Sequence, residues 1–280
     1  MNLYHFNSAK HLHELFDAGQ WRPLIGTSSV LGVIAKPLTW WASGLAVKEF
    51  GCPDPKVLTK IKNKKATEEE IGLLVQSAEA TKGDISQMTT REYVGLLDRA
   101  YRAHKTTLDD TADKGVDLHS ELERFVRWHM NVEPEPAPLV WHPRIQPFIE
   151  WTDKNVDRFL WSEMNVYSER WWLGGISDCG LVDKQGRYAI LDFKSSKEAY
   201  LSAFWQAAGY DLQIMENRGG FDADGNRTTD DQTCYHDGAD YYAILPFGME
   251  KPEVQINEDV KDCRENFLHA LALYKALPRD

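Results

Sequence analysis

Residues 171–194 read WWLGGISDCGLVDKQGRYAILDFK, and this stretch decides the fold expected for the chain. Two apolar segments, 171–182 and 187–194, have the composition of β-strands. The polar loop between them contains Gly186, which suits the left-handed third position of a three-residue hairpin loop. The sequence therefore predicts a β-hairpin in which residue 183 pairs with residue 187.

Two acidic residues face each other in this predicted hairpin. The register places Asp178 directly opposite Asp192, with their Cβ atoms about 4.5–5.5 Å apart. Two carboxylates repel, and burial strengthens the repulsion unless a positive charge lies between them. The Lys194 ammonium supplies one such charge, and carboxylate oxygens are ligands that suit Mg²⁺ or Mn²⁺. In the alternative interpretation both carboxylates lie on a solvent-facing side, and a register slip of one residue would separate them.

The two faces of the hairpin are expected to differ, because side chains alternate along a strand. Apolar residues occur on both faces, which indicates strands that are covered on both sides. The face of the two aspartates should also hold Ile176, Gly180, Ile190 and Lys194, and the other face Ser177, Cys179, Leu191 and Phe193.

The order of the other predicted elements gives the fold class. We expect helices over 30–34, 40–50, 90–103, 115–129, 148–160, 199–215 and 260–277, a helix starting at a capping box of Thr67 and Glu70, and a polar first helix with His5, His11 and His13. Strands are expected over 163–168 and 241–245 in addition to the hairpin. The chain is thus predicted to be α/β (α+β), with a helical region at 1–110 and a core with a central mixed sheet at 111–280.

The charge of the chain is unevenly distributed. Residues 1–110 hold 14 of the 32 basic and 13 of the 43 acidic residues and so carry a net charge of +1, whereas the remaining residues carry −12. An acidic chain is an unusual partner for nucleic acid unless bound cations offset its carboxylates. The basic run 56–65 is interpreted either as a solvated helix face or as a patch that contacts phosphates.

Composition excludes several classes of protein. No apolar run reaches the roughly 18 residues that a membrane span requires, and the first residues do not resemble a signal peptide, so we expect a cytoplasmic protein without a membrane partner. The four cysteines, Cys52, Cys179, Cys234 and Cys263, are too far apart for a zinc ribbon or a disulfide scaffold. We expect them to be reduced.

The ordered set Asp178-x13-Asp192-Phe193-Lys194, followed by Gln206-x3-Tyr210, resembles the PD-(D/E)XK nuclease superfamily, and most of all its RecB-type branch, which includes phage exonucleases. Residues 115–119 (GVDLH) resemble the helical histidine motif of that branch. Residues 28–31 and 36–41 resemble its N-terminal helical segment more loosely. The resemblance implies a restriction-endonuclease-like αβββαβ core.

The resemblance also implies roles for individual residues. Asp178, Asp192 and the backbone carbonyl of Phe193 would hold one or two Mg²⁺ or Mn²⁺ ions, and His119 is similar to the metal-ligating or phosphate-facing histidine. Lys194 would position water or stabilise negative charge, with Gln206 aligning it or, like Tyr210, contacting a phosphate. Glu163 would either reach the metal through water or stabilise the sheet.

The remaining expectations concern partners. DNA contacts are expected from Ser28, Ser29, Trp40, Lys60, Lys64 and Tyr210, and an iron–sulfur cluster is not expected, because the cysteine pattern of cluster-containing relatives is missing. The resulting prediction is a metal-dependent DNA exonuclease that acts on single-stranded or duplex ends in recombination, repair or phage DNA processing. A single-strand-binding or annealing protein is a candidate partner. The alternatives are a structure-specific or restriction-like endonuclease and a catalytically inactive nucleic-acid-binding module.

Overall fold

The computed structural model describes residues 3–34, 63–132, 140–228, 234–249 and 251–277, and positions 46, 48, 50, 57, 60 and 61. For residues 101, 102, 104–117 and 234 it describes the backbone alone. The chain divides into two compact units, one formed by residues 1–35 with 115–280 and the other by residues 36–114. No helix in the described ranges is both long and apolar enough to cross a bilayer.

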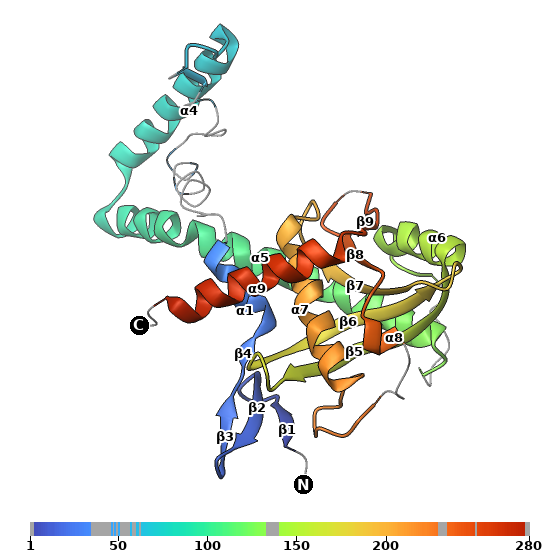
Figure 1. Cartoon of the computed structure of the whole chain (residues 1–280). Coiled ribbons are helices and arrows are strands. Elements are labelled where there is room, and N and C mark those ends of the chain that lie inside the picture. Colours follow the sequence, from blue (N-terminus) through green and yellow to red (C-terminus); the bar gives the residue numbers. More distant parts are fainter. Residues whose placement is uncertain are drawn as a thin grey trace. The chain divides into compact units, whose positions relative to one another are not determined.

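A mixed sheet forms the centre of the first unit (Figure 1). Strands β5 (Val156–Ser168), β6 (Leu173–Asp183) and β7 (Tyr188–Lys194) are antiparallel neighbours, whereas β8 (Tyr241–Pro246) runs parallel to β7. Because β7 and β8 are parallel, a helix connects them, as the sequence predicted. The mixed α/β class with a central mixed sheet is therefore confirmed.

The hairpin of β6 and β7 has the predicted register. Cys179 pairs with Leu191 and Val182 with Tyr188, and Gly186 has a φ of +81° in the connecting loop. The N–H of Gly186 donates to the carbonyl of Asp183, which closes the turn. The two strands are buried on both faces, so their side chains contact helices on either side of the sheet.

Helices cover both faces of the sheet. On one face, α5 (Thr90–His129) and α6 (Gln146–Asn155) contribute Phe125 and Phe148 to a cluster that includes Leu191 and Phe193. On the other face, α7 (Leu201–Asn217) packs against Ile190 and its neighbours, and α9 (Val260–Ala276) packs beside α7. This arrangement holds the ends of β6 and β7 between α5 and α7.

The first residues form strands and not the polar helix that was expected. Strands β1 (Tyr4–Asn7), β2 (Leu12–Asp17) and β3 (Gln20–Pro23) make a small antiparallel sheet, joined by tight turns with positive φ at His11, Ala18 and Gly19. The sequence prediction missed that His5, His11 and His13 lie in a hairpin. Strand β4 (Ile25–Gly26) then pairs with β6. These pairings tie residues 3–34 to the core, so the boundary expected at residue 110 does not match the units of the structure.

The helix predicted over 148–160 is also shorter than expected. It ends at Asn155, and β5 begins at Val156, seven residues before the predicted strand start. Residues 156–162 pair with the second half of β6, and Val156, Phe159 and Trp161 are buried there. Tertiary pairing has overridden the local helical pattern.

The remaining elements are short or lie outside the sheet. Helix α4 (Glu68–Gln87) begins at the predicted capping box of Thr67 and Glu70, and α5 continues through the gap that was expected between 103 and 115. The predicted helix over 40–50 falls largely outside the described residues. The short helices are α1 (Thr27–Val30), η1 (Leu31–Ile34), η2 (Pro143–Ile145) and α8 (Cys234–Asp237), and strand β9 (Gln255–Asn257) pairs with β8.

Candidate metal centre and active site

The candidate site lies where β6 and β7 separate. Their backbone ladder ends at the pair Cys179–Leu191, and the next residue of β6 is Asp178. The backbone N–H of Phe193 donates to Oδ2 of Asp178 over 2.7 Å. The Asp178 carboxylate therefore accepts a hydrogen bond that a backbone carbonyl would accept if the ladder continued. Asp192 and Lys194 are the two neighbours of Phe193 at the end of β7. The structure thus brings Asp178 to the strand end that carries Asp192 and Lys194, although the predicted direct pair of Asp178 with Asp192 is not part of the ladder, which stops one residue earlier.

Asp192 is paired with Lys194 in the interior of the protein. Oδ2 of Asp192 lies 2.6 Å from Nζ of Lys194, and the aspartate side chain is only 1% exposed. Burial raises the pKa of Asp192 to about 7; the positive Lys194 opposes this shift and the negative Asp178 adds to it. Burial favours a lower pKa for Lys194, but the charge of Asp192 outweighs it and the pKa rises. Oδ1 of Asp192 has no hydrogen-bond partner among the described residues.

A second group of ligand atoms forms around Asp178. Nε2 of His119, on α5, lies 3.4 Å from Oδ2 of Asp178 and 3.9 Å from Oε1 of Glu163. One atom of each of these three residues falls within 4.8 Å of the other two. The imidazole of His119 packs edge-on against the ring of Phe193, with 5.6 Å between the ring centroids. His119, Glu163 and Asp178 could therefore hold one ion together.

Glu163 has an unusual backbone conformation. Its φ is +53°, and it lies between the pairs Ser162–Cys179 and Met164–Ser177, opposite Asp178. A left-handed conformation in a residue other than glycine costs about 1–3 kcal/mol, and such residues concentrate at functional sites. This conformation accompanies the approach of the Glu163 carboxylate to His119. The sequence could not reveal it, because nothing in the local pattern marks a residue with positive φ inside a strand whose register is continuous at this point.

The pKa values of Glu163 and His119 differ from the usual values of these side chains. Burial and the negative Asp178 raise the pKa of Glu163 to about 8, while His119 opposes the shift. Burial favours a lower pKa for His119, but its hydrogen bond to Asp178 and the surrounding carboxylates outweigh burial and raise it. Like charges held close together in a partly buried site are typical of a functional centre.

The donor set fits a divalent cation. Two carboxylates and one imidazole converge, with Asp192 close by, and Oδ1 of Asp192 and Oε1 of Glu163 are buried without a hydrogen-bond partner in the described structure. The carboxylate oxygens suit Mg²⁺ or Mn²⁺, and the imidazole of His119 is the one ligand of the group that is typical of softer transition metals. Asp192 lies outside the compact group of His119, Glu163 and Asp178, because its carboxylate is directed to Lys194.

Helix α7 places Gln206 and Tyr210 above the sheet. Nε2 of Gln206 donates to Oη of Tyr210 over 2.7 Å, and Tyr210 is buried. Burial and the nearby charges of Asp192 and Asp178 raise the pKa of Tyr210, which shows that its hydroxyl stays protonated beside the site. Tyr210 packs closely on Gly175, where a Cβ atom would lie 2.6 Å from the ring.

Ser28 and Ser29 also lie near Tyr210 of α7. They line a cavity of about 270 Å³ together with Tyr210, and Gly174, Gly175, His11 and His13 complete part of its wall. The structure therefore brings these two serines next to Tyr210. The sequence prediction missed the histidines here, because His5, His11 and His13 were expected in a polar first helix.

The other predicted DNA contacts are not placed at this site. Trp40 lies outside the described residues. Lys60 and Lys64 belong to the unit formed by residues 36–114. Lys60 pairs with Glu70, and both lysines are exposed. The ion pair favours the interpretation of a solvated, charge-paired surface at Lys60.

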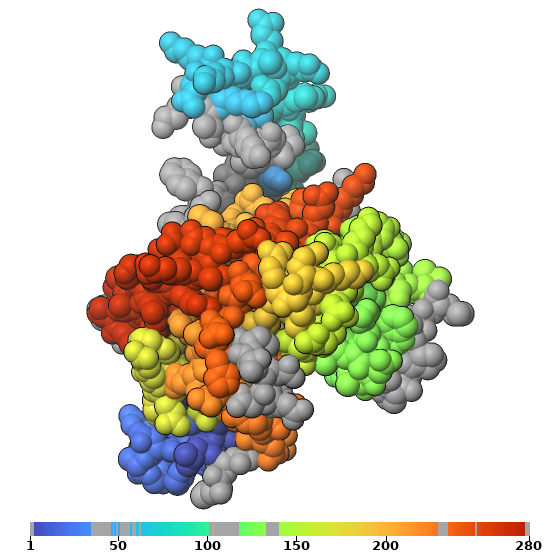
Figure 2. All heavy atoms as spheres, turned by 45° about the vertical axis from the view of Figure 1, so that its right-hand side comes forward, coloured from blue at the N-terminus to red at the C-terminus, as the bar shows by residue number. Residues whose placement is uncertain are grey.

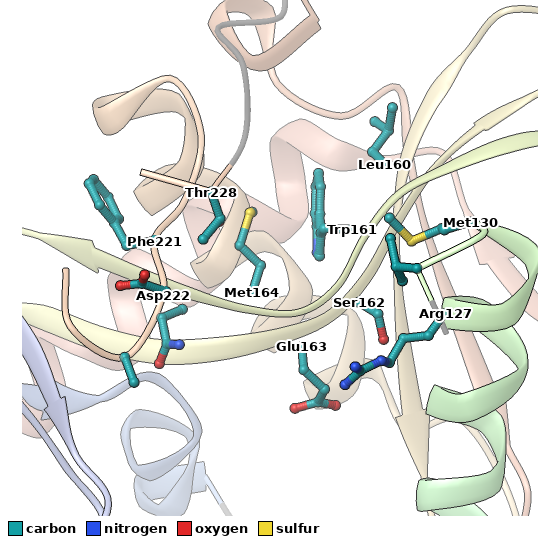
Figure 3. Close-up of a pocket in the computed structure, with 13 residues that line it drawn as sticks. Arg127, Met130, Leu160, Trp161, Ser162, Glu163, Met164, Phe221, Asp222 and Thr228 are labelled. Atoms are coloured by element: carbon teal, nitrogen blue, oxygen red, sulfur yellow. The ribbon is translucent and has the colours of Figure 1, made fainter. Parts of the chain in front are cut away.

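A larger cavity of about 390 Å³ adjoins Glu163 (Figure 3). Its wall includes Arg127 from α5, Trp161 and Ser162 from β5, and Phe221 from the loop after α7. The sequence did not point to Trp161 and Ser162, since the predicted helix ended at residue 160 and the predicted strand began only at residue 163. Correct placement of the strand start would have been needed to find them.

No family model matches the sequence, and a comparison with curated proteins found no similar chain. The function is therefore argued from the geometry of the site.

Proposed function

We propose that this protein is a Mg²⁺- or Mn²⁺-dependent DNA nuclease with a PD-(D/E)XK-type site. The observation that carries the proposal is the junction of β6 and β7, where Asp178, Asp192 and Lys194 meet His119 and Glu163. The residue types, their order along the chain and their register all agree with the pattern that the sequence resembles. The order of elements from α6 to β8 supports a restriction-endonuclease-like core.

The proposed ligands are Asp178, Asp192, His119, Glu163 and the carbonyl of Phe193. When bound at such a site, a divalent cation supplies a Lewis acid that polarises a phosphate and increases the acidity of water. Lys194 provides a compact ammonium beside this position, where it orients the attacking water and stabilises negative charge. The Asp192 carboxylate holds that ammonium in place.

Gln206 and Tyr210 would act as positioning residues. Their mutual hydrogen bond fixes the Gln206 amide over the strand ends, and the protonated Tyr210 hydroxyl carries no charge that would repel DNA. Ser28 and Ser29 line a cavity together with Tyr210 and would offer hydroxyl donors to a phosphate of the same strand. The substrate strand is thus proposed to run from the cavity at Ser28 towards Glu163.

An exonuclease is the leading form of this proposal. We expect hydrolysis of linear and nicked DNA with Mg²⁺ or Mn²⁺ and none with EDTA, measured by release of labelled nucleotides. Cleavage of covalently closed circular duplex would favour the endonuclease alternative. Binding of DNA without any hydrolysis in either metal would favour the inactive binding module.

Variants test the assignment of the site. Asp192→Asn and Lys194→Met should each lower the rate of hydrolysis by at least about 100-fold, on the scale of removing one transition-state donor. Asp157→Asn and Lys197→Met are matched controls, because both residues are exposed and neither belongs to the proposed site. Full activity in either site variant would refute the assignment.

A further inference from the structure

The orientation of the His119 imidazole depends on packing. Its Nε2 atom faces the carboxylates of Asp178 and Glu163, whereas no residue that the structure describes forms a hydrogen bond with its Nδ1 atom. A histidine that binds a metal usually donates its other ring nitrogen to a carboxylate, a carbonyl or water, and that bond fixes the direction of the ring. Protein groups that orient His119 must therefore act through ring contacts.

Two phenylalanine rings contact this imidazole. The centroid of the Phe193 ring lies 5.6 Å from that of His119, with an angle of 84° between the planes. The centroid of the Phe247 ring lies 6.4 Å away, with an angle of 66°. Both are edge-on arrangements at separations where aromatic rings attract one another. Because both phenylalanines are buried in the cluster that covers this face of the sheet, their rings present fixed surfaces to His119.

Phe247 is also attached to the chain that carries Lys194. Its backbone N–H donates to the carbonyl of Lys194 over 2.9 Å, and the N–H of Gly248 donates to the carbonyl of Ser196 over 3.0 Å. A Cβ atom at residue 248 would lie 2.1 Å from the carbonyl oxygen of Ser195, so only glycine permits this close approach. The chain that follows β8 is thereby fixed to the chain that follows β7.

The two phenylalanines differ in their relation to the candidate metal centre. Phe193 donates its N–H to Asp178, and its carbonyl is one of the proposed ligands. Phe247 supplies no proposed ligand, and its ring reaches the centre only through His119. A substitution of the Phe247 side chain therefore removes one ring contact and leaves every ligand in place.

We propose that Phe247 is a positioning residue of the candidate metal centre. Its ring holds the His119 imidazole against Asp178 and Glu163, and its backbone bond to Lys194 fixes the ring relative to the end of β7. The inference rests on the proposed function, which makes His119 a ligand. Without the Phe247 ring, the imidazole is free to turn away from the two carboxylates, and an ion loses one well-placed ligand.

A double-variant cycle in the full chain tests this proposal. Phe247→Leu keeps an apolar side chain, and it should raise the dissociation constant of Mn²⁺, measured by isothermal titration calorimetry, about three- to tenfold, the scale of one aromatic pair. In a His119→Gln background the same substitution should change the dissociation constant by less than about 1.5-fold, because the ring that Phe247 positions is gone. An equal rise in both backgrounds would overturn the proposal.

Phe125→Leu is the matched control for damage to the core. Phe125 is 2% exposed and belongs to the same cluster as Phe247, but the rings that it contacts in the described structure do not include His119. It packs between α5 and α6, whose atoms lie side by side in Figure 2. Phe125→Leu should lower the urea midpoint of unfolding and leave the affinity for Mn²⁺ unchanged. A rise in the dissociation constant as large as that of Phe247→Leu would show that loosening of the core explains both, and would overturn the positioning role.

Phe247→Met is a second variant, for the case in which leucine leaves too large a cavity for the chain to fold. The longer methionine side chain fills more of the volume of the ring and adapts to its surroundings. It lacks the aromatic edge as leucine does, so the dissociation constant of Mn²⁺ should rise by a similar factor. Wild-type affinity in a folded Phe247→Met protein would contradict the proposal.

The outcomes separate this inference from the proposed function. Hydrolysis of DNA, together with an affinity for Mn²⁺ that Phe247→Leu leaves unchanged, would overturn the positioning role and leave the nuclease intact. A loss of affinity that depends on His119, in a protein that hydrolyses no DNA, would support the positioning role and overturn the nuclease. Absence of Mn²⁺ binding in the wild type would overturn both.

Discussion

The backbone N–H of Phe193 donates a 2.7 Å hydrogen bond to Oδ2 of Asp178. A carboxylate of one strand thereby replaces the backbone acceptor that a continued ladder would have provided. The bond fixes Asp178 at the point where β6 and β7 separate, and the same Oδ2 lies 3.4 Å from His119. Asp178 thus has both a structural role and a proposed role as a ligand, and substitutions can separate the two.

Asp178→Asn should separate these roles. The amide oxygen can still accept the Phe193 N–H, so the free energy of unfolding should change by less than about 1 kcal/mol, whereas the lost charge should weaken Mn²⁺ binding by more than about 10-fold. Asp178→Ala should also destabilise the fold by about 1–3 kcal/mol, because the N–H loses its acceptor. Isothermal titration calorimetry and urea denaturation measure the two effects. Unchanged Mn²⁺ affinity in Asp178→Asn would contradict the assignment.

Lys194→Met should destabilise the protein as well as inactivate it. It leaves the buried Asp192 carboxylate without its cation, and breaking a buried pair in this way costs about 3–5 kcal/mol. The double variant Asp192→Asn/Lys194→Met should recover most of that loss, since the buried charge is removed together with its partner. Urea denaturation in EDTA measures both. Equal stability of the single and double variants would show that the pair is not coupled.

Divalent cations should stabilise the folded protein. Carboxylates that repel one another in the site gain a shared partner, and a ligand at 100 times its dissociation constant adds about 2.7 kcal/mol. Thermal denaturation with increasing Mn²⁺ should show a midpoint that rises by several degrees in the wild type. Asp192→Asn should show a smaller rise, with Asp157→Asn as the control. A rise of the same size in both variants would place the ion elsewhere.

The stability of the N-terminal sheet should decrease in acid because of His13. Burial, assisted by the charge of His11, lowers the pKa of His13 to about 4, and its Nδ1 lies 2.7 Å from the hydroxyl of Tyr4. In the unfolded chain histidine takes up a proton near pH 6.5, while the folded protein keeps His13 neutral. The stabilisation is therefore complete above pH 6.5 and is lost as the pH falls to 4, by roughly 3 kcal/mol in total.

Denaturation at pH 7 and pH 4.5 tests this expectation against a His13→Leu variant. Other groups titrate in the same range, so the informative quantity is the difference in pH dependence between wild type and variant. The wild type should lose more stability than the variant between the two pH values. An identical loss in both would show that His13 is accessible to protons in the folded state.

The sequence was sufficient to predict the β6–β7 hairpin, because the residues that determine its register are close together in the chain. A three-residue loop with Gly186 sets the register, and the period of two then assigns Asp178, Asp192 and Lys194 to one face. Amphipathic spacing likewise gave α7, which carries Gln206 and Tyr210. These features depend on neighbours within about 20 residues.

The first 35 residues and the start of β5 depended on contacts far along the chain. Strand β4 pairs with Leu173 and Gly174, and the first half of β5 pairs with the second half of β6. The local pattern of 148–160 is compatible with a helix, and only the partner strand favours an extended conformation. The periodicity of residues 148–160 does not show that the strand β6, farther along the chain, will pair with them.

In the candidate site, too, some features follow from the local sequence and others from tertiary packing. The sequence by itself determined the aspartate pair, its lysine and the hairpin that holds them, because turn geometry and alternation act over short distances. The family resemblance implied roles for His119 and Glu163, but only the tertiary structure decided that both side chains lie against Asp178, that Glu163 does so with a left-handed backbone, and that a cavity adjoins Glu163. Those relations arise from the packing of α5 and β5 against the hairpin, and packing between distant segments is not encoded in any local pattern.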